Sequence, residues 1–117
     1  QGVILSGVSA GIICWFEAGL TDSFHGKYVP LKSLCFLAGS VCPHCDSKDG
    51  RLEKYIEYIQ SEEIPSGYAI DDGVALHFEN GQLVKAVKSQ PNAMVLFISK
   101  ELGVIHQRQL ETQTLIK

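Results

Sequence analysis

Apolar residues gather near the start of the chain in two runs that are separated by small residues. The first run is Val3–Leu5 and the second is Ile12–Phe16. Their composition and length predict a buried parallel strand over Val3–Val8, followed by the beginning of a buried helix. We expect that helix to end at Gly19, because glycine is the usual residue just past a helix C-terminus. The opening of the chain therefore predicts a strand, a sharp turn and a helix.

Helical spacing recurs most clearly over Arg51–Glu63. Apolar residues repeat there at positions i, i+3, i+4 and i+7 and would form one face of a helix. The residues on that face are Leu52, Tyr55, Ile56 and Ile59. Glu17–Pro30 has no such pattern and is expected to be irregular, whereas the apolar segment Leu31–Gly39 predicts a short strand or extended segment.

The C-terminal half has the alternation of apolar and polar residues that is typical of strands. Val74–Glu79 alternates, Asn80-Gly81 is a strong hairpin signal, and Gln82–Lys88 returns along it. Further strands are expected over Tyr68–Ile70, which leads into the acidic turn Asp71-Asp72-Gly73, over Ala93–Ser99, and within Leu102–Lys117. This half of the chain therefore predicts an antiparallel meander.

Composition and charge narrow the class of protein. A chain of 117 residues suffices for one domain, and its net charge of −3 with a pI of about 5.7 argues against a nucleic-acid partner. The apolar runs are too short to cross a bilayer, no signal peptide is visible, and a disulfide framework is not indicated. A cytoplasmic protein is expected. Because the chain begins within a predicted strand that needs neighbours on both sides, we expect it to be the C-terminal part of a longer protein.

The junction of the first two elements carries a G-x-S-x-G motif, Gly7-Val8-Ser9-Ala10-Gly11. Between a strand and a helix this motif forms a nucleophile elbow, a sharp turn that exposes the serine hydroxyl. Ser9 is therefore a candidate nucleophile, and the backbone N–H of Ala10 is a candidate oxyanion donor. The alternative is a glycine-rich turn whose serine has no chemical role.

A second candidate site lies at Cys42-Pro43-His44-Cys45. Pro43 favours a strand end or loop, which would place His44 at the mouth of a sheet, where sites lie in α/β folds. The same residues match a C-x-x-C redox motif, which leaves a thiol-disulfide oxidoreductase as an alternative function. A zinc site built from Cys35, Cys42, His44 and Cys45 is a weaker alternative, since no second pair of ligands has metal-binding spacing.

Four stretches together resemble the dipeptidase E family of aspartyl dipeptidases, to which the cyanophycinases are related. They are GVSAGIICWFEAGLTDS, GSVCPHCDS, GYAIDDGVALHF and SQPNA, in family order and with family-like spacing over most of residues 2–98. The resemblance implies a three-layer α/β sandwich of the flavodoxin-like or class I glutamine amidotransferase-like type. It also implies serine-type hydrolysis of dipeptides with an N-terminal aspartate, without a metal or other cofactor. The N-terminal half of such a domain is not in this chain.

By resemblance, Ser9 matches the family nucleophile and His44 matches the family histidine. Asp22 falls close to the third member of the catalytic triad, and Asp72 is the alternative acid. An acidic substrate needs a cation, for which Arg51 is the nearest candidate in sequence; the alternative is a solvated arginine at a helix end. An exposed strand edge would favour a homo-oligomer. The third candidate function is a half-domain without catalysis.

Overall fold

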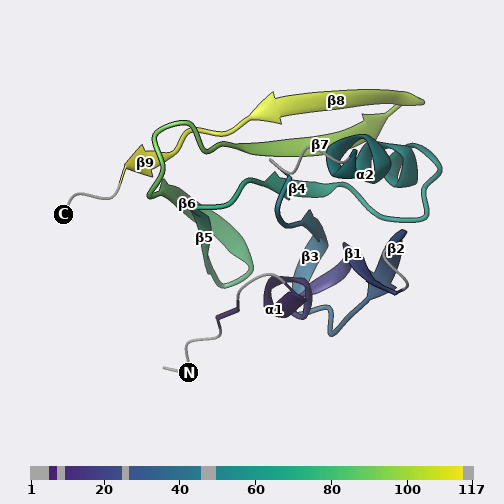
Figure 1. Cartoon of the computed structure of the whole chain (residues 1–117), viewed down its shortest axis with the longest axis horizontal. Coiled ribbons are helices and arrows are strands. Elements are labelled where there is room, and N and C mark those ends of the chain that lie inside the picture. The colour runs from purple at the N-terminus through teal and green to yellow at the C-terminus, as the bar shows by residue number, and fades with distance from the viewer. Residues whose placement is uncertain (1–5, 8–9, 25–26, 46–49, 115–117) are drawn as a thin grey trace.

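Two β-sheets form most of the computed structural model, which describes residues 6–7, 10–24, 27–45 and 50–114. In this part of the chain the larger sheet has six strands in the order β2-β1-β3-β4-β7-β8, and the smaller has three in the order β5-β6-β9 (Figure 1). The larger sheet contains β1 (Phe16–Phe24), β2 (Lys27–Lys32), β3 (Leu37–Cys42), β4 (Gly67–Ile70), β7 (Val95–Glu101) and β8 (Val104–Gln109). The smaller sheet contains β5 (Val74–Glu79), β6 (Gln82–Lys88) and β9 (Gln113–Thr114).

The centre of the larger sheet is parallel and its flanks are antiparallel. Strand β3 pairs in parallel with β1 on one side and β4 on the other, while β2, β7 and β8 are added in antiparallel pairs. Parallel strands are usually buried on both faces, and Leu20, Val41 and Cys42 of these strands have no exposed surface. The fold is thus of the mixed α/β class, as the sequence predicts.

Each face of the larger sheet has its own buried cluster. Neighbouring residues point to opposite faces, so Cys42 and Ala69 join one cluster while Val41 and Ile70 join the other. The first cluster packs against helix α2 (Arg51–Gln60), and the second includes Ile13 of the short helix α1 (Ala10–Ile13). Among the described residues, no helix is long and apolar enough to cross a membrane.

The predicted helix over Ile12–Gly19 is wrong, because helix α1 is a single turn and strand β1 begins at Phe16. The glycine at position 19 allows close packing and does not end a helix. A Cβ atom there would lie 2.7 Å from the side chain of Ile13 and 2.9 Å from the carbonyl oxygen of Val41. A larger residue would push α1 away from the sheet.

The segment Glu17–Pro30, expected to be irregular, instead forms most of an antiparallel pair. Gly19 of β1 lies opposite Leu31 of β2. The expected strand over Leu31–Gly39 is divided between the end of β2 and the beginning of β3. The predicted first strand, Val3–Val8, lies largely outside the described residues; Ser6 and Gly7, which are described, are not in a strand.

Helix α2 begins at Arg51, as predicted, but ends at Gln60 rather than Glu63. Glu62 has a φ of 65°, and the backbone N–H of Glu63 donates to the carbonyl oxygen of Tyr58 at 3.0 Å. This is the Schellman arrangement, in which a left-handed residue closes the last turn of a helix. The helix therefore ends through backbone geometry in a segment that has no glycine.

The hairpin at Asn80-Gly81 is confirmed, with φ values of 53° and 79° that suit a type I′ turn. The predicted antiparallel meander is present only in part: β5 pairs with β6 and β7 with β8, but β6 does not pair with β7. The β5–β6 hairpin leaves the larger sheet and forms the smaller one, and β4 pairs directly with β7. Local turn chemistry determines the hairpin, whereas the sheet that it joins depends on contacts distant in sequence.

Candidate active site

His44 and Asp72 lie together at the carboxyl ends of two central strands of the larger sheet. Parallel strands β3 and β4 are in register there, with Cys42 opposite Ala69, and each candidate follows the carboxyl end of its strand. The Nδ1 atom of His44 forms a hydrogen bond with Oδ1 of Asp72. The carboxyl edge of parallel strands is where ligands bind in open α/β sheets. The parallel pairing thus brings together two groups that are 28 residues apart.

Backbone hydrogen bonds hold the two turns that carry this pair. His44 has a φ of 58°, and the following residue, Cys45, donates its N–H to the carbonyl oxygen of Ile70 at 2.9 Å. Asp71 accepts a hydrogen bond from the N–H of Met94 at its Oδ2, at 3.1 Å, and returns one from its own N–H to the Met94 carbonyl. The turn after β3 is therefore tied to β4, and the turn after β4 to the residue before β7.

The pair can be reached from solvent. The side chains of His44 and Asp72 are 39% and 63% exposed. A carboxylate at Nδ1 favours the imidazole tautomer whose Nδ1 carries the proton, so that Nε2 is the basic nitrogen. The arrangement can therefore take up and return a proton at Nε2 for a group bound at this edge of the sheet.

Three of the predicted site positions are described incompletely. Ser9 lies outside the described residues. Asp22 belongs to strand β1, and Ala10 begins helix α1, but the described part of the structure does not include their side chains. The nucleophile, its oxyanion donor and the pairing of Asp22 with His44 accordingly stay predictions.

Arg51 begins helix α2 but is not solvated, so the alternative of a solvated arginine at a helix end is wrong. Its side chain is buried with 6% of its surface exposed, and its guanidinium lies 4.7 Å from the centre of the Tyr28 ring. The cation thus packs between helix α2 and strand β2. Its contact with an acidic substrate stays a prediction that nothing in this geometry favours.

The two cysteines of the C-x-x-C motif are in contact. The sulfur atoms of Cys42 and Cys45 are 2.9 Å apart, and the Cys45 thiol also lies 3.3 Å from the Cys42 carbonyl oxygen. The hydrogen bond from Cys45, together with burial, raises the pKa of the Cys42 thiol. Cys35 is exposed, and no three metal-ligating side chains gather among the residues that the structure describes.

Sequence reasoning did not anticipate the function of Asp71. Asp71 is the residue whose carboxylate fixes the turn that carries Asp72. An aspartate before a glycine-containing turn is the signal that could have indicated this, since short acidic side chains commonly bond to nearby backbone in turns.

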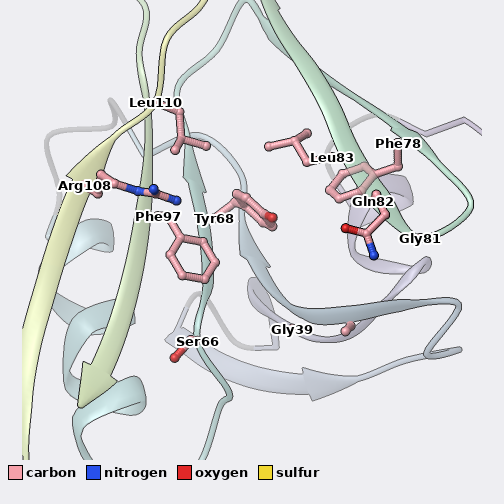
Figure 2. Close-up of a pocket in the computed structure, with 11 residues that line it drawn as sticks. Gly39, Ser66, Tyr68, Phe78, Gly81, Gln82, Leu83, Phe97, Arg108 and Leu110 are labelled. Atoms are coloured by element: carbon pink, nitrogen blue, oxygen red, sulfur yellow. The ribbon is translucent and has the colours of Figure 1, made fainter.

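A separate cleft of about 490 Å³ lies between the two sheets (Figure 2). Gly39 and Ser66 line it near the beginning of β3 and β4, with Tyr68, Phe97 and Arg108 beside them. Burial raises the pKa of Tyr68, and the charge of Arg108 opposes that effect. Because His44 and Asp72 follow the other ends of the same strands, this cleft is distinct from their site.

Comparison with known proteins gives two matches. The model of Peptidase family S51 matches residues 1–86. The "Uncharacterized peptidase YgaJ" of Bacillus subtilis (strain 168) is 52% identical over 93 residues, which cover 80% of this chain and 40% of that protein. The chain thus matches less than half the length of this curated relative. No solved structure matches the chain.

Proposed function

Because the chain belongs to peptidase family S51, we propose that it carries the catalytic serine and histidine of a serine-type peptidase. The observation that supports this proposal most is the hydrogen bond between His44 and Asp72 at the carboxyl edge of the parallel strands. Substrates would be short peptides with an N-terminal aspartate, as the resemblance to the aspartyl dipeptidases suggests.

In the proposed reaction, the hydroxyl oxygen of Ser9 attacks the scissile carbonyl carbon. Nε2 of His44 takes the serine proton and then gives it to the leaving amine, so that an acyl-enzyme forms. Water, deprotonated by the same nitrogen, then releases the acid product and restores Ser9. The backbone N–H of Ala10 would stabilise the oxyanion, a contribution of about 2.7–4 kcal/mol for one donor.

We assign Asp72 as the acid that orients His44, with Asp22 as the alternative. Asp72 has the required contact, because its carboxylate bonds to Nδ1 and so favours Nε2 as the base. Asp22 has the sequence position of the family acid. The two assignments predict different effects of Asp72→Asn and Asp22→Asn on kcat.

The chain would form the C-terminal part of a single peptidase domain. It matches 40% of the length of its curated relative, and its sheet has parallel strands at the centre. A complete domain of the three-layer, flavodoxin-like type would add further strands, helices on both faces and a second oxyanion donor.

The test is a Ser9→Ala substitution in the full-length protein. Activity on a panel of Asp-X dipeptides should fall by on the order of 10⁶ in kcat, with no change in the circular dichroism spectrum. Ser6→Ala, three residues earlier and exposed, is the matched control and should keep its activity. A Ser9→Ala protein that retains a tenth of the wild-type rate would refute the assignment of the nucleophile.

A further inference from the structure

The residue proposed as the catalytic base lies between two cysteines whose sulfur atoms touch. Cys42 ends strand β3, Cys45 follows in the next turn, and their sulfur atoms are 2.9 Å apart. The peptidase mechanism uses neither thiol. The two remaining cysteines, Cys14 and Cys35, are both exposed. The contact across His44 is therefore a feature that the proposed function does not explain.

We propose that Cys42 and Cys45 are a site of reversible oxidation by low-molecular-weight disulfides, and that the bond between them displaces His44 from Asp72. The loss of peptidase activity that follows rests on the proposed function. The oxidation itself and the displacement of His44 do not depend on it.

The two thiols differ in burial and therefore in the step that each can carry out. Cys42 has no exposed surface, whereas Cys45 is only half-buried, so an external disulfide can reach Cys45 first. The Cys45 thiolate attacks a disulfide RSSR, forms a Cys45–S–SR bond and releases RS⁻, which takes up a proton. Cys42 then loses its proton and attacks the Cys45 sulfur, releasing the second RS⁻. Two protein thiols are oxidised and one RSSR is reduced to two RSH.

The protein environment favours the second step over the persistence of a mixed disulfide. The hydrogen bond with Cys45 and burial raise the pKa of the Cys42 thiol, so Cys42 is not the thiol that attacks first. In the second step Cys42 attacks the Cys45 sulfur. The attack is then intramolecular, between atoms already in contact. Reacting groups that are held together in this way react much faster than separate molecules.

Closing the bond draws the Cys45 sulfur toward Cys42 and, in this proposal, moves the turn that carries His44 with it. The sulfur atoms must approach from 2.9 Å to about 2.05 Å, with a fixed dihedral angle about the new bond. Cys42 is fixed in a central strand, so the movement falls on the turn through His44, whose φ of 58° is already uncommon for a residue other than glycine. A displacement of about 1 Å at a catalytic group can lower the rate by about 10²-fold.

The experiment uses the full-length protein with Cys14→Ser and Cys35→Ser, and with any cysteine outside residues 1–117 also replaced by serine, so that Cys42 and Cys45 are the thiols that remain. After incubation with glutathione disulfide, we expect a mass loss of about 2 Da and protection of both remaining thiols from alkylation, reversed by dithiothreitol. The imidazole NMR signals of His44 should shift on oxidation, and hydrolysis of Asp-X dipeptides should fall at least tenfold.

A Cys45→Ser variant provides the matched control. It should keep most of the activity of the reduced protein, show no mass loss and not respond to glutathione disulfide. In the protein that retains both thiols, a stable mixed disulfide of glutathione with Cys45, or the absence of any mass change, would refute the proposed redox site. A bond that forms while the His44 signals stay unchanged would overturn the displacement. If no dipeptide is hydrolysed even under reducing conditions, the proposed function fails, while the mass and NMR measurements still decide the redox site.

Discussion

At the scale of single residues, the pair formed by His44 and Asp72 is suited to orientation rather than to stability. Both side chains are more than one-third exposed, and exposed ion pairs contribute about 0–1 kcal/mol to folding. The same hydrogen bond can nevertheless determine which imidazole nitrogen carries the proton. Loss of the Asp72 carboxylate should therefore affect catalysis much more than folding.

We predict that Asp72→Asn in the full-length protein lowers kcat by on the order of 10⁴. The free energy of unfolding should change by less than about 1 kcal/mol, because the pair is exposed. Steady-state kinetics and urea denaturation measure the two effects. Asp22→Asn is the control for the alternative acid. A larger fall in kcat for Asp22→Asn than for Asp72→Asn would show that Asp22 orients His44.

His44 and Asp72 were both identified from the sequence, with Asp72 as the alternative to Asp22, but the sequence did not show which acid pairs with His44. Pro43 after an apolar segment placed His44 at a strand end, and Asp72 was visible in an acidic turn. Which acid meets His44 depends on the parallel register that sets Cys42 opposite Ala69. That register comes from contacts between distant segments, for which a single sequence carries no local signal.

At the scale of elements, helix α2 is fixed to the larger sheet by a buried hydroxyl network. The side chain of Tyr55 is fully buried, and its oxygen lies 2.6 Å from Oγ of Ser40. Ser40 donates its proton to the carbonyl oxygen of Pro65 at 2.6 Å, so the hydroxyl group of Tyr55 is the donor to Ser40. The network joins α2, strand β3 and the segment before β4.

We predict that Tyr55→Phe destabilises the protein by about 1 kcal/mol at neutral pH, through loss of this hydrogen bond. Burial holds the pKa of Tyr55 well above 10 in the folded protein. Above pH 10 the unfolded chain therefore binds fewer protons than the folded one, and stability falls as pH rises. Below pH 10 the stabilisation that comes from the protonated hydroxyl of Tyr55 is fully present.

The difference in free energy of unfolding between wild type and Tyr55→Phe should accordingly narrow as pH rises above 10, because phenylalanine has no proton to lose. Urea denaturation at a series of pH values measures this difference. Tyr58→Phe, on the same helix but only half-buried, is the control for loss of a tyrosine hydroxyl from helix α2. A difference in free energy of unfolding between wild type and Tyr55→Phe that stays constant up to pH 11 would contradict the prediction.

Elements with local signals were predicted well, and those that depend on burial were not. The Asn80-Gly81 turn specifies its hairpin without help from the rest of the chain. The apolar run Ile12–Phe16 was predicted to begin a long helix, but it contains only the end of α1 and the first residue of β1. The rest of β1 lies in Glu17–Pro30, which was expected to be irregular because it lacks the period-2 alternation of a half-exposed strand. Gly19 added to the error. A glycine after an apolar run indicates a helix end in sequence, whereas this glycine allows close packing against Ile13.

At the scale of the whole molecule, the larger sheet leaves two edges and an apolar surface. Strands β2 and β8 end the order of its strands within the described residues. Between β2 and β3, Leu34 and Phe36 are 60% and 59% exposed, and the Phe36 ring stacks on Trp15 at 5.6 Å. Exposed strand edges and apolar patches both favour association between chains.

We predict that residues 1–117 expressed alone associate with one another and hydrolyse Asp-X dipeptides far more slowly than the full-length protein. The physical reasons are the exposed edges and the second oxyanion donor, which the proposed function assigns to residues outside these 117. Loss of one such donor lowers kcat by about 10²–10³-fold. Sedimentation velocity at several concentrations and a dipeptide assay measure the two effects. Phe36→Asp should weaken the association by placing a charge on the apolar surface, without restoring turnover. A stable monomer with the turnover of the full-length protein would show that these 117 residues form the enzyme by themselves.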